Sequence, residues 1–245
     1  MADTITADAA GAGGSKSLFA RLAGVLFAPR STYADVAARP RWLGAFFAVY
    51  LVTTSVTTAF MSTEVGRNAV VDQQISQSEA FGRRLNQQAI DRLESMSKYY
   101  AYFTPVTQFV SLAIGSLLVS AILFAVFNAI MGGDASFKQV FSIVAHSGVI
   151  LAVLSPFTTA LAYARQTLTT ATNLGVFFPF LDENSFPARL LGAIDLVFIW
   201  WIVSLAIGLA VLYRRRTGPI ATTLLVIYAS IGLIVAAVKT AFSGA

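Results

Sequence analysis

The residues with the greatest capacity for chemistry in this chain are the few ionisable side chains that lie inside long apolar stretches. Asp195 and Lys239 each lie near one end of such a stretch. Charges in hydrocarbon are costly, so they usually pair with one another or serve a function. If the last two stretches form an antiparallel helical hairpin, Asp195 faces Ala237 and lies within one turn of Lys239. We therefore expect these two charges to form an ion pair, with Arg189 or Arg165 as competing partners. A structural pair, or snorkelling toward water, is favoured over a substrate or proton site.

His146 is the only histidine, and it lies near the start of the third apolar stretch. Asn128, near the end of the second stretch, is at a compatible depth, so we predict a His146–Asn128 hydrogen bond that joins two helices. The alternatives are a proton relay or a metal ligand. The chain has no cysteine, and a metal site would need carboxylates that the stretches do not supply. We therefore predict no metal and no other cofactor.

Three common catalytic motifs are missing from the sequence. The chain has no Gly-x-Ser-x-Gly turn, no Gly-x-x-x-x-Gly-Lys phosphate loop and no paired carboxylates inside the apolar stretches. A membrane serine protease, a nucleotide-binding enzyme and a membrane aspartyl protease respectively depend on these groups. We therefore predict that the protein is not an enzyme and has no catalytic residues.

The residues considered above would be positioned by five long apolar stretches. Each provides about the 20 residues that a helix rising ~1.5 Å per residue needs to cross a ~30 Å hydrocarbon layer. The chain is 56% hydrophobic and only 12% charged, and its mean hydropathy is +0.70. These values predict an all-α fold, a polytopic membrane helix bundle with five transmembrane helices in a domain spanning residues 42–240. The predicted crossings are Trp42–Met61, Phe103–Met131, Phe141–Leu161, Leu190–Leu212 and Ile220–Val238.

The basic residues of the connections indicate the orientation. Nine of them lie on the side of the N-terminus and crowd the helix ends, whereas the eight on the other side are spread more widely and offset by acids. By the positive-inside rule the N-terminus is cytoplasmic, and five crossings leave the C-terminus extracytoplasmic. We attribute the net charge of +5 to this orientation and predict no nucleic-acid partner.

A tail and an interfacial segment precede the first crossing. Residues 1–17 are polar and small, which predicts a disordered tail without a cleavable signal. Within residues 18–41, the apolar face of Leu18–Ala28 predicts an interfacial helix on the cytoplasmic leaflet, ended by Pro29. A re-entrant or core-packed helix is the alternative. The cations expected to meet anionic headgroups are Lys16, Arg21 and Arg30.

A second short helix is predicted just before the membrane. Ser31 or Thr32 would cap it, and it would run through Val36. Pro40 then lets the chain turn, and Trp42 enters the membrane as an interfacial aromatic.

Three segments of the chain, taken in order, resemble the bacterial branch of the Yip1-domain family. FAPRSTYADVAARPRWLGAFF at 27–47 resembles the amphipathic segment that leads into that family's first crossing. GGDASFKQVFSIVAHS at 132–147 resembles its turn into the third crossing, and LLGAIDLVFIWWIVSLAIGL at 190–209 resembles its fourth. The resemblance covers nearly all of residues 18–240. It implies a five-pass protein of the bacterial inner membrane, without an established activity.

One family feature is missing. The eukaryotic branch carries an Asp-Leu-x-Gly-Pro motif near the first crossing, and this chain does not. The association of that branch with small GTPases and vesicle traffic is therefore not carried over.

Two connections contain apolar residues of their own. The spacing in residues 62–102 predicts an amphipathic helix of several turns, which Gly82 divides in two. This helix would lie on the outer leaflet or cap the bundle; a docking site for an extracytoplasmic partner is the alternative. The run Val176–Leu181 is too short to span and is expected to dip into the membrane interface, with a lid over a cavity as the alternative. Small residues that would let helices approach closely are the pairs Ser111/Gly115, Ser204/Gly208 and Gly232/Ala236. Packing within the bundle is the favoured interpretation, and an oligomer interface is the alternative.

Two functions of different class fit these features. We favour a non-enzymatic Yip1-like membrane protein that organises protein partners or lipids through its cytoplasmic segment. Its expected partners are membrane lipids and a membrane or cytoplasmic protein. The second is a small transporter or channel subunit, which would need interrupted helices and a polar path near the midplane. The residues of the candidate partner segment are Phe27, Pro29, Arg30, Tyr33, Pro40 and Trp42.

Overall fold

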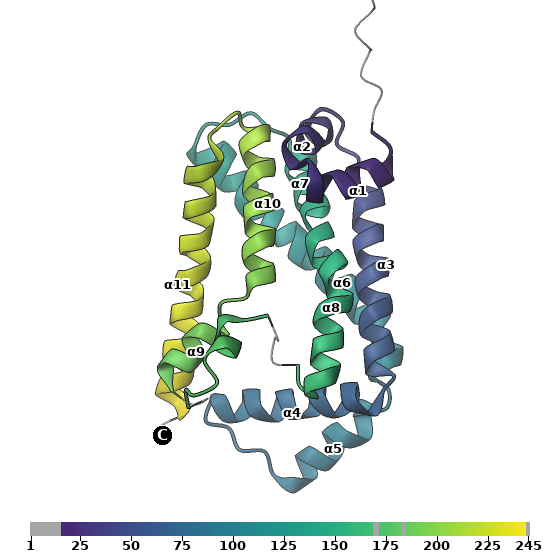
Figure 1. The fold of residues 1–245 in the computed structure, drawn as a ribbon, viewed down its shortest axis with the longest axis vertical. Helices are drawn as coiled ribbons and strands as arrows, with labels where there is room; N and C mark the ends of the chain where they lie inside the picture. Colours follow the sequence, from purple (N-terminus) through teal and green to yellow (C-terminus); the bar gives the residue numbers. More distant parts are fainter. Residues whose placement is uncertain (1–15, 169–171, 183–184, 244–245) are drawn as a thin grey trace, which may run out of the picture.

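The computed structural model describes residues 16–168, 172–182 and 185–243, and the regular elements in those ranges are all helices. The long helices run side by side along the vertical axis of the molecule, with short helices across both ends (Figure 1). Four helical segments are long and apolar enough to cross a membrane: Trp42–Met61, Tyr100–Ile130, Phe137–Arg165 and Thr217–Phe242. The prediction of an all-α membrane helix bundle is confirmed. The predicted tail falls almost wholly on residues 1–15, which lie outside the described ranges.

The long helices follow the predicted stretches, with extensions at their ends. Helix α6 continues into a turn of π-helix at Ala125–Ile130, and α7 and α8 meet at Gly148. Their bounds are α3 Trp42–Met61, α6 Tyr100–Phe124, α7 Phe137–Ser147, α8 Val149–Arg165, α10 Leu196–Leu212 and α11 Thr217–Ser243.

The predicted fourth crossing is wrong in its first six residues. Residues 190–192 belong to a separate short helix, α9 Phe186–Gly192, and α10 begins only at Leu196. Asp195 is the reason, because its carboxylate accepts hydrogen bonds from the backbone N–H groups of Val197 and Phe198 and so caps α10. An N-cap residue has a non-helical backbone, which interrupts the helix at that point. The interrupted α10 is 17 residues long.

The end of the bundle that holds the C-terminus is covered by the long first connection (Figure 1). It forms α4 Glu64–Ala80 and α5 Gln87–Ser97, and Gly82 between them has φ +72°. That left-handed conformation suits glycine because it lacks Cβ. The predicted division at Gly82 is therefore confirmed. Helix α4 contacts both α3 and α11, so the connection caps the bundle.

The other end carries α1 Leu18–Phe27 and α2 Pro29–Ala38. The expectation that Ser31 or Thr32 would cap the second helix is wrong. Pro29 takes the first helical position instead, where its missing N–H has no intrahelical partner to lose. Thr32 is fully buried.

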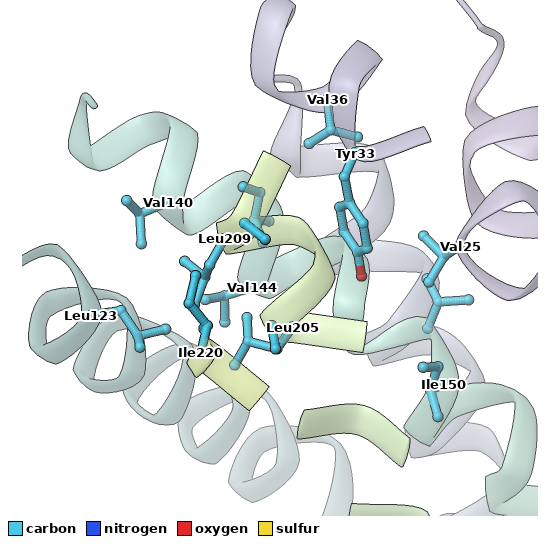
Figure 2. Packing of buried hydrophobic residues seen from close by; sticks show 14 of the residues in the cluster. Val25, Tyr33, Val36, Leu123, Val140, Val144, Ile150, Leu205, Leu209 and Ile220 are labelled. Atoms are coloured by element: carbon cyan, nitrogen blue, oxygen red, sulfur yellow. The ribbon is translucent and has the colours of Figure 1, made fainter. Parts of the chain in front are cut away.

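The main hydrophobic core lies close to this amino-terminal end and joins α1, α2, α7 and α10 (Figure 2). Gly208 of α10 lies against two core residues: a Cβ there would lie 2.5 Å from Cγ2 of Ile143 and 3.1 Å from the ring of Tyr33. The predicted close approach at Ser204/Gly208 is thus confirmed. Because Gly208 has no side chain, the ring of Tyr33 from α2 can pack directly against α10. At Gly115 the same added Cβ would meet nothing within 4 Å, so the predicted close packing of another helix of this chain at Gly115 is wrong.

Candidate functional site at the amino-terminal end

An ion pair ties α1 to α2 beneath the surface. Nε of Arg21 lies 2.7 Å from a carboxylate oxygen of Asp35, and the two side chains are 3% and 16% exposed. Arg21 also donates to the backbone carbonyl of Arg39 at 3.2 Å. The expectation that Arg21 meets lipid headgroups is wrong, because the partner carboxylate in α2 draws the guanidinium inward. The face of α1 that carries Arg21 and Val25 is buried in the core, as in the alternative of a core-packed helix.

Tyr33 is the anchor of α2. Its side chain is fully buried, and its hydroxyl lies 2.7 Å from Oγ of Ser204 in α10. Burial raises the pKa of Tyr33 above its ordinary value, and the hydrogen bond with Ser204 opposes that shift. Tyr33 therefore belongs to the core, and its assignment to a partner-binding surface is wrong.

His146 lies in the same region but does not meet Asn128. Its Nδ1 is 2.7 Å from the backbone carbonyl of Ser142, and since a carbonyl only accepts, Nδ1 donates. Asn128 donates to the carbonyl of Ala135 at 2.6 Å and accepts from the hydroxyl of Tyr213 at 2.7 Å. The predicted His146–Asn128 bond is not formed, because Nδ1 of His146 bonds to the carbonyl of Ser142 and both polar atoms of Asn128 bond to Ala135 and Tyr213.

Two buried nitrogen atoms near this ion pair have no hydrogen-bond partner: Nη2 of Arg21 and Nε2 of His146. Arg21 and Asp35 also interact electrostatically with His146. The site thus combines a buried charge pair, a buried imidazole and unused polar atoms. Unpartnered buried polar groups are destabilising, and here they sit at the junction of α1, α2 and α7.

Asp195 and Lys239 are not brought together. The carboxylate of Asp195 accepts from Oγ1 of Thr172 at 2.7 Å as well as from the two N–H groups of α10. The predicted ion pair is therefore not formed, since neutral donors occupy the carboxylate. Tyr228 completes this arrangement: its hydroxyl accepts from the N–H of Asp195 and donates to the carbonyl of Ala193.

The other residues of the predicted partner segment lie nearer the surface. Phe27 is 86% exposed and Arg30 is exposed, while Pro29 and Pro40 are half-buried at the ends of α2. Trp42 packs edge-on against Phe141 with ring centroids 5.0 Å apart. Phe27 and Arg30 are therefore the members of this set that remain available to a partner.

The two ends of the bundle differ in charge. Among the described residues, the opposite end carries eight basic and six acidic residues, whereas the amino-terminal end carries nine basic residues and only Asp35 and Asp134 as acids. Asp35 is already paired with Arg21. The cations exposed at the amino-terminal end are Arg30, Arg39, Arg41, Lys138, Arg214, Arg215 and Arg216.

A family model provides an independent comparison. The Yip1 domain model matches residues 23–238 of the 245. The chain belongs to the Yip1 domain family. Neither the search of curated proteins nor the search of solved structures returned a match. In this Yip1-domain protein the match begins inside α1 and ends inside α11, so it includes nearly all of the bundle.

Several residues of the site had no recognisable signal in the sequence. Asp35 stands among small residues in a short helix, and Ser204 looks like an ordinary small residue of an apolar stretch. Tyr228 is one tyrosine in a long apolar helix. Each gains its role from a partner at least 14 positions away. In the part of the chain that the structure describes, no group of three His, Cys, Asp or Glu side chains could hold a metal ion.

Proposed function

We propose that this protein is a non-enzymatic, five-crossing membrane protein whose amino-terminal end gathers anionic lipids in the cytoplasmic leaflet of a bacterial inner membrane. The observation that carries the proposal is the concentration of exposed cations at that end, beside the exposed aromatic rings of Phe19 and Phe27. Near an anionic surface each Lys or Arg contributes about 1 kcal/mol.

The arrangement of the helices supports this orientation. Helices α3, α6, α7–α8, α10 and α11 succeed one another in alternating directions, so that α1 and the last turn of α11 lie at opposite ends of the bundle (Figure 1). The cationic end would be cytoplasmic under the positive-inside rule. Helix α1 lies across that end, and Phe19 and Phe27 are 80% and 86% exposed on it. These rings would enter the interfacial layer while Arg21 and Val25, both buried, hold α1 to the bundle.

The test compares two matched triple variants of the full chain in nanodiscs of phosphatidylcholine containing a minority of phosphatidylglycerol. Arg30, Arg39 and Arg41 are changed to Gln in one variant, and Arg83 and Arg84 together with Arg92 are changed to Gln in the control. Native mass spectrometry of the released complexes counts the phosphatidylglycerol retained.

We expect the first variant to lose several-fold in retained phosphatidylglycerol, because three cations worth about 1 kcal/mol each are removed. The control should retain as much as the parent protein. Equal losses in the two variants, or none in either, would contradict the proposal. Ultraviolet crosslinking from Phe27 to a reproducible protein partner would favour a protein-organising role at the same face.

A second candidate function is a small transporter or channel subunit. The interruption of the fourth apolar stretch at Asp195 favours it, since transporters use broken helices at their binding sites. Against a continuous path, fully buried side chains fill the bundle toward the amino-terminal end; they are Tyr33, Ile143, Ile150 and Leu209. Uptake assays in liposomes with Asp195→Asn and Lys239→Ala test this candidate.

A further inference from the structure

A cavity lies between α3, α8 and α10, away from the cationic end. Its volume is about 240 Å³. Its walls are mostly apolar, with Phe60 on α3 and Phe198 on α10 as aromatic members. Its polar lining residues are Asp195, Thr158, Thr159 and Thr172.

The backbone beside this cavity is irregular. Asn173 pairs with Asp195 in an isolated antiparallel bridge, and the N–H groups of Leu174 and Leu196 donate to the carbonyls of Ile194 and Thr172. Irregular backbone at membrane depth is tolerated only where it is buried in protein or lines a cavity. Broken membrane helices of this kind recur at ligand sites near the midplane.

The depth of Asp195 follows from a contact between helices. The indole of Trp201 donates to Oγ of Ser147 at 3.0 Å, so these two residues lie at the same level. Ser147 is ~15 Å along the ~43 Å of Phe137–Arg165, at ~1.5 Å per residue. Asp195 lies ~9 Å farther along α10 in the same direction. It is therefore close to the middle of the membrane-crossing segment.

The charge of the cavity determines which ligands it can accept. Asp195 is 7% exposed, and the donors that surround its carboxylate are neutral: Thr172 and the first N–H groups of α10. An anionic ligand would be repelled, since the carboxylate already occupies the helix N-terminus that would otherwise attract it. A cation would gain an opposite charge in a low-dielectric setting. Phe60 and Phe198, which also line the cavity, suit such a ligand because aromatic rings attract ammonium groups.

We propose that this cavity binds a small amphipathic ammonium compound, with its charged nitrogen at Asp195 and its apolar body against Phe60 and Phe198. A cavity of about 240 Å³ lies below the ~300–1,000 Å³ range of pockets that hold drug-sized ligands. A whole phospholipid does not fit, whereas a primary amine with one ring or a short chain does. The inference is independent of the proposed lipid-gathering role, which concerns other residues at the opposite end.

The test measures binding of benzylamine, which has a protonated amine on one aromatic ring, to the full chain in phosphatidylcholine nanodiscs. Benzyl alcohol and benzoate serve as neutral and anionic probes of the same size. Ligand-observed NMR gives each dissociation constant. For a fragment of this size we expect a Kd of about 1 mM for benzylamine, at least tenfold weaker binding of benzyl alcohol and no binding of benzoate.

Three variants separate the cavity from non-specific partition into lipid. Asp195→Asn removes the charge while Asn remains a good N-cap, and it should reduce benzylamine binding to the level of benzyl alcohol. Leu151→Trp fills the cavity and should abolish binding of both probes. Val153→Trp, at a position 52% exposed on the same helix, should bind as the parent does. Equal binding of benzylamine and benzyl alcohol by the parent, or unchanged binding by Asp195→Asn or Leu151→Trp, would overturn the inference.

Discussion

The side chains of Arg21 and Asp35 are buried to different degrees, so removing one or the other should destabilise the protein by different amounts. Replacing Asp35 with Ala leaves the guanidinium of Arg21, whose side chain is 3% exposed, without a counter-charge. Breaking a buried pair in this way costs about 3–5 kcal/mol. The damage falls on the docking of α1, since this pair joins α1 to α2. We therefore expect α1 to open from the bundle far more often in Asp35→Ala.

Thiol labelling measures this opening directly. The chain has no cysteine, so Val25→Cys places a single thiol at a position in α1 that is 2% exposed. In detergent, a maleimide reaches this thiol only when α1 opens. At 1.4 kcal/mol per tenfold change, Asp35→Ala should raise the labelling rate by about 100-fold to 3,000-fold in the Val25→Cys background.

The reverse variant should do less damage. Arg21→Met leaves Asp35, which is 16% exposed and still has a nitrogen of Arg39 at 3.9 Å. We expect its rate to rise by about tenfold, because a partly exposed carboxylate is screened by water. The double variant Arg21→Met with Asp35→Leu removes both charges and should label more slowly than Asp35→Ala alone.

Arg30→Met is the matched control, because Arg30 lies on α2 but is exposed. It should leave the labelling rate unchanged. The reasoning is refuted if Asp35→Ala labels no faster than Arg30→Met, or if Arg21→Met proves the more harmful of the two single variants.

Three further measurements test other parts of the structure. In intact cells an impermeant maleimide should label a cysteine at Ser78 and spare one at Ser31, as a cytoplasmic amino-terminal end requires; the opposite pattern would reverse the proposed orientation. Gly208→Val should lower stability by about 1–3 kcal/mol, since a Cβ there would lie 2.5 Å from a methyl group of α7, whereas Gly115→Val should have little effect on Tm. Burial, together with the charge of Asp134, raises the pKa of Tyr213 to about 12. Its neutral phenol therefore stabilises the fold fully below its unfolded pKa of about 10, and that contribution is lost as the pH rises toward 12. The Tm difference between the parent and Tyr213→Phe should be constant below pH ~10 and then shift against the parent.

The sequence alone determined those helix boundaries that depend only on residues close to them in the chain. The first crossing, Trp42–Met61, begins and ends as predicted because its length and apolarity alone satisfy a helix across hydrocarbon. The division of the first connection at Gly82 follows from one residue that adopts a left-handed backbone readily. The end of α1 before Pro29 likewise needs only the rigid geometry of proline.

The interaction partners of the polar side chains were decided by the tertiary structure. Whether Arg21 reaches lipid or Asp35, and whether Tyr33 faces a partner or Ser204, depends on how α1 and α2 fold back onto the bundle. His146 and Asn128 have compatible depths, but each finds a nearer backbone carbonyl. The depth of a side chain in the membrane can be estimated from its position in an apolar stretch. The rotation of its helix and the residues that it contacts depend on tertiary packing, which the local sequence does not specify.

Asp195 illustrates both what the sequence determines and what only the tertiary structure decides. The sequence alone marks it as an ionisable residue in an apolar stretch, and therefore as a residue that needs partners. Its partners are Thr172, the first turn of α10 and the hydroxyl of Tyr228. Only the folded chain brings Thr172 and Tyr228, which are 56 positions apart, to the same point, because the free energy of satisfying a buried charge depends on which groups lie nearby in space.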